Sequence, residues 1–177
     1  MRSGNIEKIQ SDSRLVVYKN LTLTNKKPYL LYDTVAVAGN LTIQAGATIY
    51  MHTGAMLHAY GNVTAQGTKD RPIVFRGDRT DMLFDSVPYR MASGQWNGIY
   101  LIHAEGIVPP VYKMDYVDIL SGSVGLYVYS ESTGSILPTL MLSNSRIHNH
   151  SIYGLVLQNV NAEVVNSEIS NCASYCV

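Results

Sequence analysis

Residues Val37–Thr68, VAGNLTIQAGATIYMHTGAMLHAYGNVTAQGT, contain an internal repeat. The segment GNLTIQ at 39–44 returns as GNVTAQ at 61–66, 22 positions later (61 − 39). Apolar and polar residues alternate within each copy, and side chains along a β-strand point to opposite faces with a period of two. Leu41 and Ile43 are therefore expected to face a protein interior, and the polar residues between them to face outward.

Stacking of the two copies would form a continuous core. Strands this short cannot each bury a face alone, but coils stacked about 4.8 Å apart would place Leu41 on Val63 and Ile43 on Ala65. A leucine-rich repeat has a similar period, yet it needs an L-x-x-L-x-L frame and a helical return, which this sequence lacks. The repeat predicts an all-β fold, a single-stranded parallel β-helix (a solenoid) with coils of about 22 residues and one inserted loop.

The composition fits an elongated all-β protein. The 177 residues include 13 Tyr, one Trp and two Phe, and the formal net charge is zero at pH 7. A neutral chain lacks the basic surface typical of nucleic-acid binding, so no nucleic-acid partner is expected. No apolar run approaches the ~20 residues of a membrane span, so no transmembrane span is expected.

The chain is expected to divide into two segments. Residues 1–28 begin polar and hold two strand-like pieces, Leu15–Tyr18 and Leu21–Leu23, so they would cap the first coil or form the tail of a preceding region. Residues 29–177 would form the β-helix. The repeat places Val177 part-way through a coil without a polar cap after it, although terminal repeats normally close the core with a polar face. The β-helix is thus expected to be incomplete there, with end-to-end contact at its open coil.

The last third of the sequence repeats the coil pattern. Three isoleucines align at successive coils: Ile119, Ile147 and Ile169. The residues before them, Asp118, Arg146 and Glu168, are expected to stack on one outward face with alternating charge, which favours cross-strand pairing. Asn149 and Asn171 would likewise stack at a corner. We interpret these columns as scaffold features.

Residues 76–95, RGDRTDMLFDSVPYRMASGQ, interrupt the repeat. Twenty residues without a clear strand pattern are unusual inside a compact repeat, and such excursions are often binding loops. The candidate binding residues here and just beyond are Arg76, Asp78, Arg79, Asp81, Tyr89, Arg90 and Trp96. Arg and Asp would bind a sugar's carboxylate or hydroxyls, with Tyr89 and Trp96 as stacking faces. Alternatively, the charges pair with each other and pin the loop to the coil wall.

The cysteines and histidines do not have the spacing of a metal site. Cys172 and Cys176 are four apart, too far for a disulfide within an extended strand unless a turn lies between them, so free buried thiols are expected. His148 and His150 would point to the same side of a strand, and two imidazoles without a third ligand rarely bind zinc. The sequence therefore predicts no metal site and no cofactor.

Three short segments carry a resemblance to a known group of proteins. AGATIYM (Ala45–Met51), PIVFRGDR (Pro72–Arg79) and GQWNGI (Gly94–Ile99) make the chain resemble right-handed parallel β-helix proteins of Bacteroidetes, within the pectate-lyase-like superfamily. The resemblance implies a right-handed β-helix. It also implies an exported protein of the cell envelope, cell surface or extracellular space.

Two functions follow as expectations. The first is a non-catalytic β-helical scaffold, or a glycan- or protein-binding domain, of an exported cell-envelope protein. The alternative is a polysaccharide lyase or glycoside hydrolase of the same superfamily. A lyase needs converging carboxylates for Ca²⁺ with a nearby base, and a hydrolase needs a pair of carboxylates. In the sequence, residues able to form such a cluster come from the excursion: Asp78, Arg79, Asp81, Asp85 and Arg90.

Overall fold

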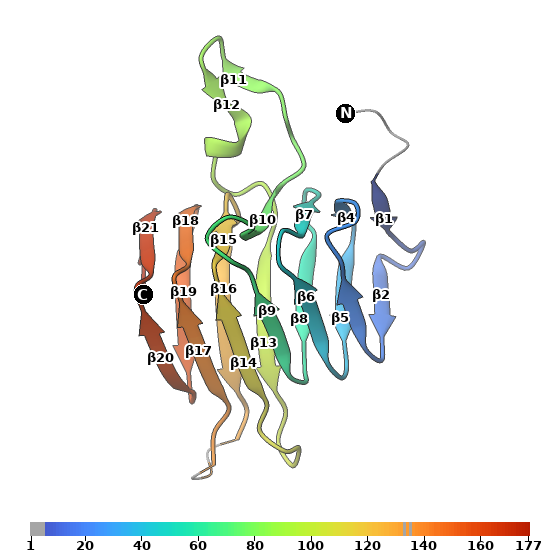
Figure 1. Ribbon diagram of the computed structural model, residues 1–177, viewed down its shortest axis with the longest axis vertical. Helices are drawn as coiled ribbons and strands as arrows, with labels where there is room; N and C mark the ends of the chain where they lie inside the picture. Colours follow the sequence, from blue (N-terminus) through green and yellow to red (C-terminus); the bar gives the residue numbers. More distant parts are fainter. Residues whose placement is uncertain (1–5, 133, 135) are drawn as a thin grey trace.

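The computed structural model describes residues 6–132, 134 and 136–177, and nearly all regular structure in them is β (Figure 1). Three long parallel sheets account for most of the strands. Sheet A contains β1 (Glu7–Ile9), β4 (Tyr29–Leu31), β7 (Thr48–Met51), β10 (Ile73–Gly77), β15 (Val117–Leu120), β18 (Arg146–His150) and β21 (Glu168–Cys172). Sheet B contains β2 (Leu15–Tyr18), β5 (Thr34–Val37), β8 (Met56–Ala59), β13 (Gly98–His103), β16 (Val124–Ser130) and β19 (Tyr153–Gln158). Sheet C contains β3 (Leu21–Leu23), β6 (Leu41–Gln44), β9 (Val63–Gln66), β14 (Val111–Asp115), β17 (Thr139–Ser143) and β20 (Asn161–Val165).

The chain visits sheets A, B and C in turn and then returns to sheet A, and we call each such circuit a coil. Every strand of these three sheets pairs in parallel with its equivalents in the neighbouring coils, as β6 does with β3 and β9. Long parallel sheets built in this way are compatible with a β-helical solenoid. The prediction of an all-β protein with stacked parallel strands is confirmed.

The register confirms the stacking predicted from the sequence. Leu41 pairs with Val63 and Ile43 with Ala65, so the two GN-x-T copies lie on neighbouring coils. The three aligned isoleucines also pair in order: Ile119 with Ile147, and Ile147 with Ile169. Coil length is not constant, because the corners and excursions between the strands differ in length while the strands keep their register.

Every second residue along a strand is apolar and points into the interior, and these residues together fill the core. In sheet A the column runs through Ile49, Phe75, Ile119 and Ile147, each at most 1 % exposed. Burial of about 25 cal/mol per Å² of apolar surface is the main stabilising term for such a core. The alternation also fixes the outward residues, which carry the chemistry of each face.

The first three strands continue the sheets. β2 and β3 have the bounds expected for the two strand-like pieces, and they pair with β5 and β6. β1 pairs directly with β4, with Glu7 opposite Tyr29. Strand stacking in the described chain therefore begins at Glu7, inside the segment 1–28 that we expected to be a cap or a preceding tail.

The excursion after β10 has regular structure of its own. It holds a short antiparallel hairpin, β11 (Met82–Phe84) with β12 (Val87–Pro88), followed by the 3-10 helix η1 (Tyr89–Met91). The hairpin projects beyond the end of the sheets (Figure 1), and most of its apolar side chains are exposed, Phe84 at 71 %.

Within the described residues no helix is long and apolar enough to cross a membrane.

Candidate functional site

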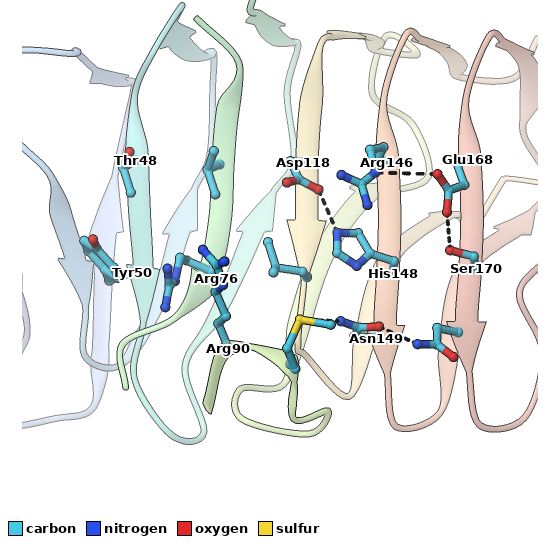
Figure 2. Close-up of a pocket in the computed structure, with 14 residues that line it drawn as sticks. Thr48, Tyr50, Arg76, Arg90, Asp118, Arg146, His148, Asn149, Glu168 and Ser170 are labelled. Atoms are coloured by element: carbon cyan, nitrogen blue, oxygen red, sulfur yellow. Dashed lines mark hydrogen bonds and ion pairs between the residues drawn. The ribbon is translucent and has the colours of Figure 1, made fainter. Parts of the chain in front are cut away.

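A groove of about 770 Å³ lies over the outer face of sheet A (Figure 2). Its floor consists of two rows of outward side chains from β7, β10, β15, β18 and β21, which the parallel register brings into line. The first row is Thr48, Val74, Asp118, Arg146 and Glu168. The second row is Tyr50, Arg76, Leu120, His148 and Ser170. Asn149 and Asn171 extend the floor, and Arg90 and Met91 of η1 form one wall.

The wall is held in place by hydrogen bonds at the base of the excursion. The Gln95 amide Nε2 donates to the carbonyl oxygens of Tyr89 at 2.7 Å and Ala92 at 2.8 Å. The Ser121 hydroxyl donates to the carbonyl oxygen of Arg90. Gln95 packs against Gly77, where a Cβ would collide with its side chain, so a larger residue at Gly77 would displace the wall.

The charged column predicted from the sequence is confirmed in register, and it lies in this groove. Arg146 pairs with Asp118 on one side and with Glu168 on the other. Arg146 forms an ion pair with Glu168 at 3.6 Å, and Ser170 donates to Glu168 at 2.7 Å. Asp118 instead contacts the imidazole Nε2 of His148 at 2.9 Å, so the column splits into two separate pairs. Our interpretation of the column as scaffold alone missed its place in the groove.

Arg76 and Arg90 provide positive charge at the other end of the groove. The Arg76 guanidinium lies over the Tyr50 ring, 5.7 Å from its centroid, and donates to the carbonyl oxygens of Gly77 and Arg79. Among the described residues, no carboxylate lies within ion-pair distance of either arginine. Figure 2 shows both side chains on the same side of the groove, apart from the Asp118–His148 and Arg146–Glu168 pairs.

Three other candidates from the excursion form a cluster outside the groove. Arg79 pairs with Asp81 at 2.5 Å, and its guanidinium lies 3.5 Å from the centroid of the Tyr89 ring. The hydrogen bond between them raises the pKa of Arg79 and lowers the pKa of Asp81. The Arg79–Asp81 pair lies at an exposed surface, where an ion pair contributes little to the stability of the fold. These charges satisfy one another, as the alternative interpretation of the loop expects.

Asp78 and Trp96 lie apart from this cluster. Asp78 contacts His52 at 2.6 Å, and His52 stacks on Tyr32. Trp96 is 1 % exposed, and its indole N–H donates to the carbonyl oxygen of Leu120 at 3.0 Å. The expectation of a Trp96 stacking face is therefore wrong, because the ring belongs to the core beneath the groove.

The two histidines of β18 do not share one side of the strand. Asn149 between them has a positive φ of 59°, a left-handed conformation that Asn tolerates and that breaks the alternation of side chains. His148 faces the groove, whereas His150 is buried against Trp96. Asn171 repeats this conformation on the next coil and donates to the side-chain oxygen of Asn149 at 2.8 Å, so the predicted Asn column is confirmed.

Within the described residues, the acidic side chains of the excursion do not form the carboxylate cluster expected of a calcium site. Asp78 and Asp81 turn to separate partners. Within the described part of the chain, no three His, Cys, Asp or Glu side chains are placed to hold a metal ion. The arrangement instead offers a cationic end, the Arg146–Glu168 ion pair, the Asp118–His148 contact and a line of amide and hydroxyl groups.

Comparison with protein-family models, with curated proteins and with solved structures found no match for this chain.

Proposed function

We propose that the chain is a right-handed parallel β-helical domain of an exported cell-envelope protein, and that its groove binds an extended, carboxylate-bearing glycan without cleaving it. The β-helix and the location are supported by the resemblance of AGATIYM, PIVFRGDR and GQWNGI to β-helix proteins of Bacteroidetes. The three parallel sheets are compatible with that fold. The ligand is proposed from the groove alone.

The observation that carries the proposal is the pair of arginines at one end of the groove. Arg76 and Arg90 both line it and have no carboxylate partner among the described residues. A planar guanidinium binds a carboxylate through two parallel hydrogen bonds. Two such groups at one site favour an anionic ligand over a neutral one.

The rest of the groove suits a polymer of sugars. Asn149, Asn171 and Ser170 offer amide and hydroxyl groups along the floor, which match sugar hydroxyls. Tyr50 presents an apolar ring beside Arg76, and aromatic rings pack against the C–H faces of sugars as they do against other apolar surfaces. Since the floor crosses five strands, it would contact several sugar units at once.

The test is calorimetric titration of the purified chain with oligogalacturonate and with a neutral cello-oligosaccharide of equal length. The acidic oligomer is expected to bind, and its affinity to fall as salt is raised from about 0.1 M to about 1 M, where the Debye length shrinks from ~10 to ~3 Å. Replacing Arg76→Gln and Arg90→Gln together is expected to weaken binding at least ~10-fold, because a hydrogen bond to a charged group contributes about 1.5–3 kcal/mol.

The matched control removes two positive charges elsewhere. Lys69 lies in an exposed turn and Lys113 on the outer face of sheet C, so Lys69→Gln with Lys113→Gln is expected to leave the affinity unchanged. Equal loss in both double variants would show that net charge, not the groove, attracts the ligand. Equal binding of the neutral oligomer would contradict an anionic ligand.

One observation favours hydrolysis as a second candidate. Asp118 and Glu168 stand on strands two apart in sheet A, which places their Cα atoms roughly 9.6 Å apart at ~4.8 Å per strand. In inverting glycosidases the carboxyl groups themselves, not the Cα atoms, are about 6.5–9.5 Å apart, a separation that side chains on strands two apart reach by leaning toward each other. Release of reducing sugar that stops in both Asp118→Asn and Glu168→Gln would establish hydrolysis and overturn the non-catalytic assignment.

A further inference from the structure

The two cysteines lie on either side of the last described corner between sheets A and B. Cys172 is the final residue of β21. The chain bends at 173–174, and Tyr175 then pairs with Tyr153 at the edge of sheet B. The structure therefore places a turn between Cys172 and Cys176, so an extended strand does not hold their Cα atoms apart.

Both cysteines border Gly154 of the coil beneath them, Cys172 through its sulfur and Cys176 through its carbonyl oxygen. A Cβ built on Gly154 would lie 2.9 Å from the Cys172 sulfur and 2.7 Å from the Cys176 carbonyl oxygen. The backbone fixes this position, because the Gly154 and Leu155 amides donate to the carbonyl oxygens of Tyr175 and Cys176 at 3.1 and 2.8 Å. The absence of a side chain at Gly154 leaves the space into which Cys172 points.

The Cys172 thiol therefore lies beside the backbone of Cys176. Partial burial, together with the neighbouring Cys176, raises the pKa of Cys172 to about 11. The Cys172 sulfur also lies 3.3 Å from the carbonyl oxygen of Ser170, to which its S–H donates. Both residues are only partly buried and both are free thiols, so a small oxidant can reach the pair.

We propose that Cys172 and Cys176 form an intrachain disulfide when the protein meets a small-molecule disulfide such as oxidised glutathione. One cysteine thiolate attacks a sulfur of the oxidant, forms a mixed disulfide and releases one glutathione thiolate. The other cysteine, after losing its proton, attacks the protein sulfur of that mixed disulfide and releases the second glutathione thiolate. The two cysteines are oxidised and one glutathione disulfide is reduced to two thiols.

The bond would fix the start of the seventh coil. It would hold Tyr175–Val177 against the edge of sheet B, where Leu155 already donates to Cys176. Cys172 follows Asn171 directly, and Asn171 is part of the groove floor. Oxidation would therefore stiffen the corner next to the groove without adding a contact to any ligand.

The experiment oxidises the full chain, first reduced and freed of reductant, in a series of reduced and oxidised glutathione mixtures. We expect a monomer that loses two hydrogen atoms in mass, retains no reactive thiol and carries no glutathione. Its thermal midpoint is expected to rise on oxidation. The double variant Cys172→Ala with Cys176→Ala is expected to show the same midpoint in every mixture.

Single variants separate pairing from general reactivity. Cys172→Ser and Cys176→Ser are each expected to lose the internal bond and to keep one thiol, free or bound to glutathione. The proposal is overturned if both thiols of the unaltered chain stay reactive in oxidised glutathione. Two glutathione adducts per chain, or disulfide-linked dimers in place of the internal bond, would overturn it equally.

Discussion

His150 is the residue whose protonation the fold opposes most clearly. It is 1 % exposed, its Nε2 lies 3.2 Å from the Ile119 carbonyl oxygen, and its Nδ1 is buried with no hydrogen-bond partner among the described residues. Burial lowers the pKa of His150 from 6.5 to about 4. The charged imidazolium is disfavoured because the core cannot solvate it. His150 is therefore neutral in the folded chain at neutral pH.

This burial predicts acid sensitivity in a defined window. Between about pH 6.5 and pH 4 the unfolded chain binds a proton at His150 that the folded chain does not, so the free energy of unfolding falls as pH drops. The contribution is present above pH 6.5 and the loss reaches at most about 3 kcal/mol near pH 4. Urea unfolding followed across this range measures it.

His150→Gln isolates the effect. Glutamine can still donate to the Ile119 carbonyl oxygen but does not titrate, so the variant is expected to lose less stability than the unaltered chain between pH 7.5 and pH 4. If both chains lose stability in parallel, other groups cause the acid sensitivity and His150 is not protonated on unfolding.

The sequence predicts the position of a side chain well where the repeat is regular. It predicts burial poorly where burial depends on contacts with residues distant in the sequence. Asp118, Arg146 and Glu168 were placed in one column from the alignment alone, and the register agrees. Trp96 was expected at the surface because it follows a polar loop. Its burial depends on Gly122, whose missing side chain leaves room for the indole, and that contact joins residues 26 apart (122 − 96).

At the level of elements, the excursion is an insertion into a corner between sheets A and B. A neighbouring coil connects the same two sheets with only a few residues. β7 ends at Met51 and β8 begins at Met56, so residues 52–55 suffice to pass from sheet A to sheet B. Between β10 and β13 the same passage contains the hairpin and η1. Deletion of Arg79–Ser93 would join Asp78 to Gly94 and leave a corner of similar length, 78 and 94–97.

We predict that this deletion variant folds and that its groove binds more weakly. The three sheets remain paired through β10 and β13, so far-UV circular dichroism is expected to keep its β-type spectrum. Loss of Arg90 removes one of the two cationic side chains, and the affinity for oligogalacturonate is expected to fall about as far as in Arg90→Gln. Calorimetry of both variants gives the comparison. An insoluble or unfolded deletion variant would show instead that the excursion is needed to close the coil.

The groove is the feature that the sequence predicts least completely. The sequence indicates Arg76 and Arg90 as binding residues of the loop and the charged column as part of the scaffold, without indicating that they share one groove. The sequence did not reveal the register of β10. This register puts Val74 beside Asp118, and it therefore puts Arg76 beside Leu120 in the next row. The apolar alternation of Ile73–Phe75 was visible in the sequence, but the long excursion hid which later strand follows it in space.

For the whole molecule, sheets A and B present chemically different outer faces. Sheet A carries the charged groups of the groove. The outward positions from β5 to β19 in sheet B are all uncharged: Thr34, Ala36, Met56, His58, Tyr100, Ile102, Tyr127, Tyr129, Val156 and Gln158. There Tyr100 and Tyr127 stack with ring centroids 5.7 Å apart. An anionic ligand has partners on sheet A that the corresponding positions of sheet B do not offer.

The interior column of sheet A predicts how stability is distributed along the stack. Ile119 is fully buried between Phe75 and Ile147, whereas Ile169 of β21 is only partly buried. Truncating a buried isoleucine to alanine costs about 2–5 kcal/mol, since contacts are lost and a cavity is left. In a solenoid each coil is stabilised by its nearest neighbours. Ile119→Ala is therefore expected to cost more than Ile169→Ala, by about 1 kcal/mol or more.

Urea unfolding of the two variants, followed by circular dichroism, measures the two costs, and amide hydrogen exchange shows where the loss occurs. Ile119→Ala is expected to lower protection in β10, β15 and β18 together, because its neighbours on both sides lose contacts. Ile169→Ala is expected to lower protection mainly in β18 and β21. Equal costs, or a loss of protection spread evenly over all coils in both variants, would mean that the sheets unfold as one unit and that nearest-neighbour stacking does not govern their stability.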